Sequence, residues 1–499
     1  MRVTELGVLW RCGLLRVQPR QVVLILRAWW RCRNSFAFLS TTAAVRWGER
    51  VALEDDDGAL TFAELHRRSL ALAHRLSGEA GLRVGSQVAL RASNGRGFVV
   101  GLLACTRLGA DVLPLAPDLP PLVTEAILRR QQIEGLLCEA DSAEAVPCWP
   151  WLSDLAQTTV EPPPVARGGQ LVVLTSGTSG ISKGIRRRPT LNQLLPLALG
   201  LLQSLNLRTH RPIVAALPLH HGYGLATLAM ALALGSPLHV ATRYEVEPLL
   251  ERLDPEEAPV LVTVPTLLKR WLDGGPGETR PTTIITGSAP LDAGLCARLL
   301  AQLGPVLFNL YGSTEAGLIA LAPPETLLQS PGSVGRPLPG NAVRVVDSQE
   351  QEVQPGQVGR ILARGPFVLP SRPDGWRDTG DLGQWDRHGN LSVRGRADGM
   401  IVSGGENVYP YEVEEVLSSH PDVAEAVVWA VSDEAFGQRL AAAVLPRPGG
   451  KLEEGALLEW LKERLERHKR PRVIRVVAEI PRNPLGKVDR VKLRSQIVG

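Results

Sequence analysis

The residues of this sequence with the clearest chemical potential form a run of glycines and hydroxyl side chains that includes a lysine. The run extends from Thr175 to Gly184 and directly follows an apolar stretch, residues 171–174. Glycines let a polyanion approach the backbone, hydroxyl and N–H groups donate to phosphate oxygens, and Lys183 adds a positive charge. The spacing is not that of the GxxxxGK[ST] loop, because Gly184 stands where that loop has its magnesium-binding hydroxyl. A flexible linker is the alternative, but the preceding strand and the lysine favour a phosphate-binding loop.

Lysine usage points the same way. The sequence has seven lysines against 48 arginines, and both Lys183 and Lys487 adjoin a glycine. A chain that uses arginine for almost every cation, yet keeps lysine at these two places, is typical of sites that need a compact point charge. Chance retention is the other explanation.

Four further apolar runs also lead into small or polar residues. They cover residues 213–217, 260–264, 283–286 and 306–310, and they precede residues 218–222, 265–266, 287–290 and 311–315. A strand followed by a helix, repeated along the chain, predicts an α/β fold with largely parallel strands. In such sheets ligands bind beyond the carboxyl ends of the strands, which is where these polar residues fall.

The remaining elements predict the domain organisation. Residues 62–76 are expected to form a helix that Thr61 and Glu64 close with a capping box, and residues 98–108 a second helix. After Gly340 short strands and turn signals predict a β-rich lobe. We therefore expect an Arg-rich N-terminal extension (1–40), a large domain of parallel-sheet α/β subdomains plus the β-rich lobe (41–395), and a small α+β C-terminal domain (396–499).

Composition excludes some classes of protein. With 499 residues, 44% apolar and 21% charged, the chain is a folded protein of more than one domain. A net charge of +4 gives no sign of nucleic-acid binding. The longest apolar helical stretches, residues 195–207 and 223–235, are too short to cross a bilayer and are expected to be buried helices.

The six cysteines form no CxxC pair. Their scatter, without nearby histidines, argues against a zinc site or a disulfide framework. It predicts reduced, buried thiols and a cytoplasmic protein.

The first forty residues hold seven arginines and one acid, Glu5, interleaved with Leu, Val and Trp. Three explanations compete: a transit peptide, an amphipathic surface helix that touches a membrane, and upstream sequence included by a misassigned start. The sequence does not decide between them.

Five motifs occur in the order seen in the adenylate-forming superfamily, which includes acyl-CoA synthetases, luciferases and the adenylation domains of peptide synthetases. They are the glycine-rich loop, Tyr311–Glu315, Asp378–Asp381, Gly395–Arg396 and Pro481–Lys487. Five motifs in order are specific, and the chain resembles this superfamily over roughly residues 45–499.

The resemblance implies roles for individual residues. Lys487 would bridge the substrate carboxylate and the α-phosphate, Thr314 would donate to phosphate or carboxylate, and Glu315 would hold Mg²⁺. His221 matches a histidine of acyl- and aryl-activating relatives, while the aspartate of amino-acid-activating relatives is absent. Nucleotide binding would fall to Thr175, Ser176, Gly177, Thr178, Ser179, Gly180, Lys183, Gly287, Ser288, Ala289, Tyr311, Gly312, Asp381 and Arg396. His220 would be structural.

The resemblance also implies a moving small domain. Its hinge would be Asp398–Gly399, and the loop Ser403–Gly404–Gly405 would meet the thiol after rotation. Gly399 departs from the Asp or Lys usual at the hinge, which puts control of the rotation in doubt. Ser288 replaces a common glycine, Val402 a common lysine and Ser182 a common proline, but no required adenylation group is missing.

We therefore expect an ATP- and Mg²⁺-dependent ligase that converts a fatty or aromatic carboxylic acid into an acyl-adenylate and then into a coenzyme A thioester. The alternatives are transfer to a separate carrier protein and a regulatory protein that only binds ATP. The expected partners are small molecules, with a carrier protein or a membrane touched by the N-terminal extension as further candidates, and no nucleic acid.

Overall fold

The computed structural model describes residues 3–119, 121–139, 146–150, 165–175, 183–187, 191–399, 401–403, 406–433, 437–465, 469–483 and 486–497. The chain forms two compact units. The first comprises residues 1–332, 337–341 and 365–369, and the second comprises residues 333–336, 342–364 and 370–499. The predicted boundary at residue 395 lies inside the second unit, which joins the β-rich lobe to the C-terminal piece.

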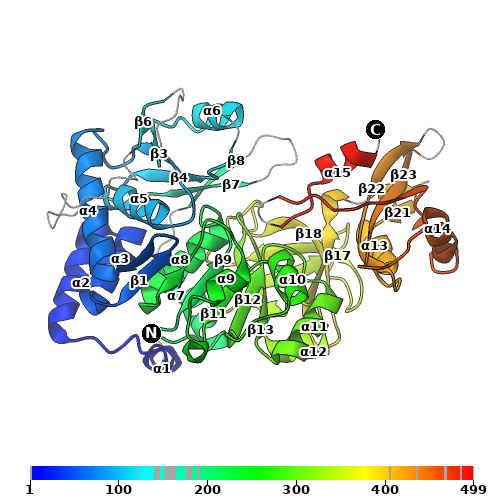
Figure 1. The fold of residues 1–499 in the computed structure, drawn as a ribbon, viewed down its shortest axis with the longest axis horizontal. Helices are drawn as coiled ribbons and strands as arrows, with labels where there is room; N and C mark the ends of the chain where they lie inside the picture. Colours follow the sequence, from blue (N-terminus) through cyan, green and yellow to red (C-terminus); the bar gives the residue numbers. More distant parts are fainter. Residues whose placement is uncertain are drawn as a thin grey trace. The chain divides into compact units, whose positions relative to one another are not determined.

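One sheet of the first unit is built from strands in the order β6-β5-β3-β4-β7-β8. Its strands are β3 (Gln87–Arg91), β4 (Asp111–Leu115), β5 (Gly135–Cys138), β6 (Cys148–Trp149), β7 (Leu171–Thr175) and β8 (Lys183–Arg187). All neighbours are parallel except β7 and β8. Helix α5 (Arg96–Arg107) packs on β3 and β4 (Figure 1). This helix is buried along its length because its side chains are almost all apolar or small.

A larger sheet of the same unit runs in the order β14-β13-β12-β11-β9-β10-β1-β2. Its strands are β1 (Val51–Asp55), β2 (Gly58–Thr61), β9 (Ile213–Ala216), β10 (Leu238–His239), β11 (Val260–Thr263), β12 (Thr283–Gly287), β13 (Leu307–Ser313) and β14 (Gly317–Ala322). The six central strands of this order, β13, β12, β11, β9, β10 and β1, are parallel to their neighbours. The hairpins β1–β2 and β13–β14 at the two ends are antiparallel. The chain passes from the second unit to the first within the short β15 (Arg336–Pro337).

Helices surround these sheets in the first unit (Figure 1). They are α1 (Val3–Arg11), α2 (Pro19–Cys32), α3 (Phe36–Trp47), α4 (Phe62–Gly78), α6 (Pro121–Arg130), α7 (Leu191–Ser204), α8 (Gly222–Leu234), α9 (Val246–Leu250), η1 (Pro255–Glu257), α10 (Pro265–Gly274), α11 (Ala293–Leu303) and α12 (Pro324–Gln329). Helix α4 confirms the predicted capping box, since Thr61 Oγ1 accepts from the Glu64 N–H at 3.2 Å and Glu64 accepts from the Thr61 N–H at 2.8 Å. Helices α7 and α8 confirm that the two apolar stretches are helical, but α7 ends at Ser204, before the predicted end at residue 207, and is only partly buried.

The N-terminal helices are part of this body. Val8 and Cys12 belong to the main hydrophobic core of the unit, and the Cys12 carbonyl accepts from the Thr209 N–H at 3.0 Å. Helix α3 buries Ala37, Thr41 and Ala43. The Arg-rich segment therefore packs on the large unit from α1 onward.

The second unit contains two sheets, of which the first is antiparallel and the second is mixed. The first runs β16 (Ala342–Val346), β17 (Gly359–Arg364), β18 (Arg377–Trp385), β19 (Leu391–Arg396). The second holds β20 (Ile401–Ser403), β21 (Glu406–Val408), β22 (Val423–Asp433), β23 (Gly437–Pro446) and β24 (Val473–Val476), the last parallel to β23. Its helices are η2 (Ala397–Gly399), α13 (Pro410–Ser418), α14 (Glu454–Lys462) and α15 (Arg490–Ile497).

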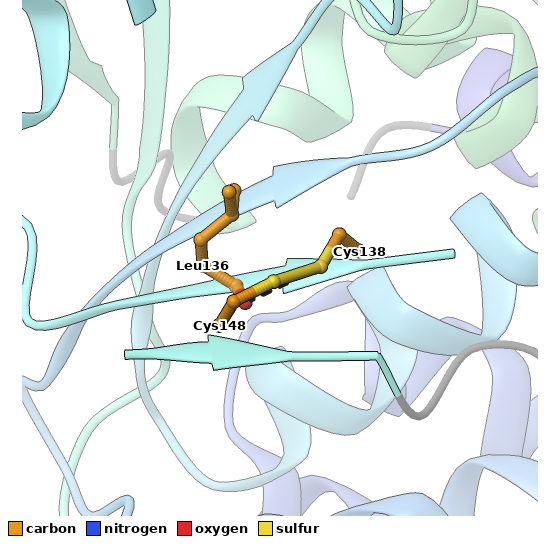
Figure 2. Close-up of a disulfide and its surroundings, with 3 residues drawn as sticks. All are labelled: Leu136, Cys138 and Cys148. Carbon is orange, nitrogen blue, oxygen red and sulfur yellow. Dashed lines mark hydrogen bonds between the residues drawn. A yellow bond between two sulfur atoms is a disulfide. The ribbon is translucent and has the colours of Figure 1, made fainter. Parts of the chain in front are cut away.

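The structure corrects two predictions of local structure. The strand-then-helix pattern is wrong after β7 and after β13, because each of these strands turns back into an antiparallel partner. The prediction that all six cysteines are reduced is wrong for Cys138 and Cys148, which form a disulfide between neighbouring strands β5 and β6 (Figure 2). The other four cysteines are buried and form no disulfide.

Among the described residues, no helix is long and apolar enough to cross a membrane.

Candidate functional site

The hairpin β13–β14 carries the predicted adenine-binding residues. Tyr311 is 8% exposed and pairs with Ala320 across the hairpin. Next to it, a Cβ on Gly312 would stand 2.2 Å from the Gly317 carbonyl oxygen, so a side chain at this position would displace the turn. Glycine is therefore required where β13 and β14 come together beside the tyrosine ring.

The turn of this hairpin presents Thr314 and Glu315. Ser313 Oγ accepts from the Ala316 N–H at 3.0 Å, and the Glu315 carbonyl accepts from the Leu369 N–H at 3.1 Å. The Glu315 side chain is half-buried. Within the described ranges no cation is paired with its carboxylate, which leaves oxygens suited to a hard cation such as Mg²⁺.

The neighbouring strand β12 ends in Gly287, which is followed by Ser288 and Ala289. Gly287 lies opposite Leu310 in the parallel register, and a Cβ on it would stand 2.7 Å from the Leu310 carbonyl oxygen. Ser288 has φ +66°, a left-handed conformation in which glycine is relaxed and serine is strained. The backbone of these residues and Tyr311 thus lie on adjacent strand ends.

His221 lies at the start of α8, after β9, and precedes its first residue. Its ring stacks at a tilt on His220, with 4.3 Å between the ring centroids. Burial lowers the pKa of His220 to about 4, so this ring is neutral near pH 7. His220 is 6% exposed, which agrees with the structural role expected for it, while His221 is half-buried and more accessible.

A residue that the sequence analysis missed holds this histidine loop in place. Asn94 Nδ2 donates to the Leu217 carbonyl at 2.8 Å, and Asn94 Oδ1 accepts from the Leu219 N–H at 2.9 Å. Its side chain therefore hydrogen-bonds both the carbonyl before Pro218 and the N–H after it, just ahead of His220. Asn94 follows β3 in a turn before α5, and the only sequence signal was its place in Ser93–Asn94–Gly95.

Two further contacts fix the start of α8. Tyr223 Oη donates to the Ile285 carbonyl of β12 at 3.0 Å. A Cβ on Gly224 would stand 2.2 Å from the Pro218 carbonyl oxygen, so the helix approaches the loop more closely than a side chain would allow. The start of α8, which follows His221, is thereby bonded to β12, the strand that ends at Gly287.

The glycine-rich loop is described only at its two ends. Thr175 and Lys183 lie opposite each other in the antiparallel pair β7–β8. The predicted phosphate-binding residues between them, Ser176, Gly177, Thr178, Ser179 and Gly180, lie outside the described residues. The prediction of a strand directly before this loop is confirmed.

In the second unit, Asp381 and Arg396 face each other. They are paired in the register of β18 and β19, and Arg396 Nη1 lies 3.3 Å from Asp381 Oδ1. The side chain of Asp381 is 15% exposed and that of Arg396 is 55% exposed. Thr379 Oγ1 accepts from the Asp381 N–H at 3.1 Å. Gly380 has φ +73°, and a Cβ there would stand 2.8 Å from the Arg396 guanidinium.

Lys487 lies at the end of a tight turn. Asn483 organises the turn, because its N–H donates to the Lys487 carbonyl at 2.8 Å and its Oδ1 accepts from the Lys487 N–H at 3.0 Å. Gly486 has φ +75°, and its carbonyl accepts from Arg482 Nη1 at 2.6 Å. The backbone of Lys487 is fixed at both its N–H and its carbonyl, while its side chain is exposed.

The predicted hinge and thiol-binding residues follow β19. Asp398 and Gly399 belong to the short helix η2, and Gly399 does not have a left-handed φ here. Ser403 ends β20 and pairs with Gly437 of β23. Gly404 and Gly405 lie outside the described residues.

The structure therefore brings the predicted residues together within each unit. The first unit gathers Gly287, Ser288, Ala289, Tyr311, Gly312, Thr314 and Glu315 at adjacent strand ends. The helix that His221 precedes is bonded to the same strand β12 through Tyr223. The second unit joins Asp381 to Arg396 and holds Lys487 on a separate turn. Lysine, hydroxyl and carboxylate groups of these types can bind a nucleotide triphosphate and its Mg²⁺.

Comparison with known proteins covers most of the chain. The profile described as AMP-binding enzyme matches residues 40–371, and the profile described as AMP-binding enzyme C-terminal domain matches residues 412–487. 2-Succinylbenzoate–CoA ligase of Bacillus licheniformis is 31% identical over 476 residues, covering 89% of this chain and 96% of that enzyme. Indoleacetate–CoA ligase of Aromatoleum aromaticum is 30% identical over 497 residues, covering 90% and 95%.

Solved structures agree with this fold. O-succinylbenzoate coenzyme A synthetase from Bacillus subtilis, in complex with ATP and magnesium ion, is similar with a TM-score of 0.78 and 29% identity. The similarity covers 91% of this chain and 99% of that one. The same enzyme in complex with its acyl-adenylate intermediate gives a TM-score of 0.79 at 28% identity, covering 91% and 97%. The predicted class, a large α/β domain with a small α+β C-terminal domain, is confirmed.

Proposed function

The chain belongs to the family of AMP-binding enzymes and is an ATP- and Mg²⁺-dependent ligase of a carboxylic acid with coenzyme A, and we propose that its acid is aromatic or fatty. Support comes from relatives named for succinylbenzoate and indoleacetate, both aromatic acids. Tyr223 gives further support. Its hydroxyl donates to the Ile285 carbonyl, so the side chain would present an apolar ring, and no unpaired hydroxyl, to the acyl group.

The observation that carries the site assignment is the cluster on strands β12 to β14. Tyr311 would lie against adenine, with the backbone of Gly287, Ser288 and Ala289 beside it. The left-handed Ser288 supports this role, since backbone strain is commonly kept where a site requires it. Thr314 would donate a hydrogen bond to the phosphate or to the acid. The residues of the glycine-rich loop and Lys183 would bind the remaining phosphate oxygens.

In the first half-reaction an oxygen of the carboxylate attacks the α-phosphorus of ATP, and pyrophosphate leaves. Two anions must approach each other, so the Lys487 ammonium group would stabilise the negative charge that develops between them. Glu315 would hold Mg²⁺, which when bound neutralises charge on the phosphates. Asp381 would accept hydrogen bonds from the ribose hydroxyls, and Arg396, its ion-pair partner, would keep that carboxylate in place.

In the second half-reaction the sulfur of coenzyme A attacks the acyl carbon, and AMP leaves. We propose that rotation at Asp398–Gly399 exchanges Lys487 for the loop Ser403–Gly404–Gly405 at the acyl group. His221 would line the path of the acyl group. The hydrogen bonds of Asn94 fix the loop before it, and the Tyr223 hydrogen bond fixes the helix after it. The limits 41–395 and 396–499 remain our proposal for the parts that move against each other, and residues 1–40, proposed as an extension, pack on the larger part.

The acceptor and the acid can be tested together. The purified enzyme is supplied with ATP, Mg²⁺ and a panel of aromatic and aliphatic acids, and thioesters are detected by mass spectrometry. Parallel reactions contain coenzyme A or a phosphopantetheinylated carrier protein, which presents the same thiol arm. The proposal predicts coenzyme A thioesters of aromatic or fatty acids. Thioesters formed only on the carrier protein, or only from small dicarboxylic acids, would contradict it.

We also propose a cytoplasmic location, where the substrates ATP and coenzyme A are abundant. The four buried cysteines outside the disulfide are consistent with it, whereas the Cys138–Cys148 disulfide is not typical of that compartment. Fractionation of cells with an antibody to the chain is the direct check.

A further inference from the structure

Helix α2 presents an unusual outer surface. Its contact with the body of the protein is a narrow stripe of Gln21, Ile25, Ala28 and Cys32, at spacings of four, three and four residues. Of these, Ala28 and Cys32 are each 3% exposed. The rest of the helix faces outward, and this outward surface carries more apolar side chains than the buried stripe.

The outward apolar side chains also follow helical spacing. Val22, Leu26 and Trp29 succeed one another at four and three residues, and Val23, Leu26 and Trp30 at three and four, so they form one continuous stripe. Six large apolar side chains of this short helix are exposed. Leu24, at 45%, lies on the far side of the arginines, and the other five form the stripe. Their exposed fractions are Val22 46%, Val23 66%, Leu26 61%, Trp29 44% and Trp30 52%.

Positive charge lies along one edge of this stripe. At about 100° per residue, Arg20, Arg27 and Arg31 fall within about 40° of one another around the helix axis. Residues 1–48 contain eight arginines and one acid, Glu5, which gives them a net charge of +7. Since the whole chain carries +4, residues 49–499 carry −3. The positive charge of the protein is therefore concentrated in the segment that contains α2.

The protein body fixes the orientation of this surface. Gln21 Nε2 donates to the Val45 carbonyl at 3.1 Å, and Ser35 Oγ donates to the Cys32 carbonyl at 2.8 Å. The buried Arg107 donates to Cys32 Sγ at 3.7 Å. The helix is thus anchored along its inner stripe and cannot turn its apolar residues inward.

We propose that this α2 surface binds an anionic lipid bilayer, with the helix lying in the plane of the interface. Valine, leucine and tryptophan would enter the boundary between headgroups and acyl chains, and the arginines would contact lipid phosphates. The helix has 14 residues and is about 21 Å long, so it lies on a membrane and does not cross it. A second copy of the chain is a poorer occupant, because two surfaces of the same strong positive charge would face each other. A nucleic acid would match the arginines but leave the apolar stripe in water.

Flotation of the full-length protein with vesicles tests this proposal. Binding is expected to vesicles of phosphatidylcholine mixed with phosphatidylglycerol, to weaken with salt, and to be much weaker with phosphatidylcholine alone. The double variant R20Q/R27Q should lose about twenty-five-fold in vesicle affinity, since each arginine near an anionic surface contributes about fivefold. R243Q/R270Q removes two exposed positive charges from elsewhere in the same unit and should leave binding nearly unchanged.

The apolar stripe needs its own test with a matched control. V23S/L26S should reduce binding more than L328S/V491S, which alters two comparably exposed apolar residues at 62% and 79%. Brominated acyl chains should quench tryptophan fluorescence of the bound protein, and less so in Trp30→Phe. All variants should keep acid-dependent pyrophosphate release in the absence of vesicles, which shows that they fold.

Three results would overturn the proposal. They are equal affinity for neutral and anionic vesicles, equal losses in the α2 variants and their controls, and a change of molar mass in V23S/L26S by light scattering without an effect on vesicle binding. The last result would identify the α2 surface as a contact between protein chains.

Discussion

At the scale of single residues, the site depends on side chains that fix backbone rather than touch substrate. Asn94 is the clearest case, because one buried amide satisfies a carbonyl and an N–H that flank Pro218. Losing such a pair leaves buried polar groups unsatisfied, at a cost of about 1–3 kcal/mol each. The loop that carries His221 should then shift while the nucleotide residues on β13 stay in place.

Asn94→Ala is accordingly expected to raise the KM for the acid about tenfold or more, with the KM for ATP nearly unchanged. Steady-state pyrophosphate release with each substrate varied in turn measures this, and urea unfolding measures the stability loss. Thr227→Val, which removes another buried hydrogen bond of α8, is the matched control. Equal effects of Asn94→Ala on both KM values would contradict the positioning role.

Lys487 gives a second prediction at this scale. Because its ammonium group would act on the charge that develops during adenylation, Lys487→Ala should lower acid-dependent pyrophosphate release by a factor on the order of 10²–10³. Thioester formation from a supplied acyl-adenylate should fall far less, since that step would not use the lysine. The exposed Lys492, a few residues along in α15, is the control, and Lys492→Ala should retain both activities. Equal loss of both half-reactions in Lys487→Ala would contradict the assignment.

At the scale of elements, the disulfide links the edge strand β6 to β5. It closes a loop with a sequence separation of 10 residues, and a closure of that length contributes about 2–3 kcal/mol in the chain-entropy description. Cys148→Ser should lower the free energy of unfolding by that amount under oxidising conditions. Reductant should bring the wild type to the same value and leave the variant unchanged. Six alkylatable thiols in the untreated, unfolded wild type would contradict the pairing.

Much of the element structure was predictable from local sequence. The capping box of Thr61 and Glu64 and the apolar helices α7 and α8 depend on residues a few positions apart, so periodicity and cap chemistry suffice. The hairpins after β7 and β13 were not predictable, because a strand followed by glycine and hydroxyl residues precedes a helix as readily as a returning strand.

Long-range contacts explain the other misses. Asn94 meets Leu217 and Leu219 across more than a hundred residues, and a lone asparagine in a turn carries no sign of that partner. Cys138 and Cys148 become neighbours only because β5 and β6 pair in parallel. The motif residues Tyr311, Asp381 and Lys487 could be named because their order along the chain resembles a known family, not because spacing reveals their positions in space.

At the scale of the whole molecule, buried histidines predict a pH dependence of stability. Burial lowers the pKa of His66 to about 3, helped by Arg107 and Arg67, and lowers those of His220 and His239 to about 4. All three belong to the first unit. Since folding lowers these pKa values, the contribution of the three neutral histidines to the free energy of unfolding is fully present above the unfolded-state pKa near 6.5. It is lost as the pH falls from there toward 4, by on the order of 3 kcal/mol per histidine.

His239→Gln tests this dependence because His239 lies on β10 and has no assigned role in catalysis. Glu54 lies 3.5 Å from its Nδ1, and Arg252 adds to the lowering of its pKa. Urea unfolding between pH 7.5 and pH 5 should show a smaller loss of stability in His239→Gln than in the wild type. His388→Gln, which changes an exposed histidine of the second unit, should leave the slope unaltered. An unchanged slope in His239→Gln would refute the assignment.

The central claim is that one enzyme first makes an acyl-adenylate and then a coenzyme A thioester. The most direct measurement is pyrophosphate release from ATP and Mg²⁺ across short, medium, long and aromatic acids, each with and without coenzyme A. We predict release that depends on particular acids, with an acyl-adenylate present when coenzyme A is omitted and a thioester when it is supplied. Pyrophosphate release that is independent of any acid, or no release with any member of the panel, would contradict the account.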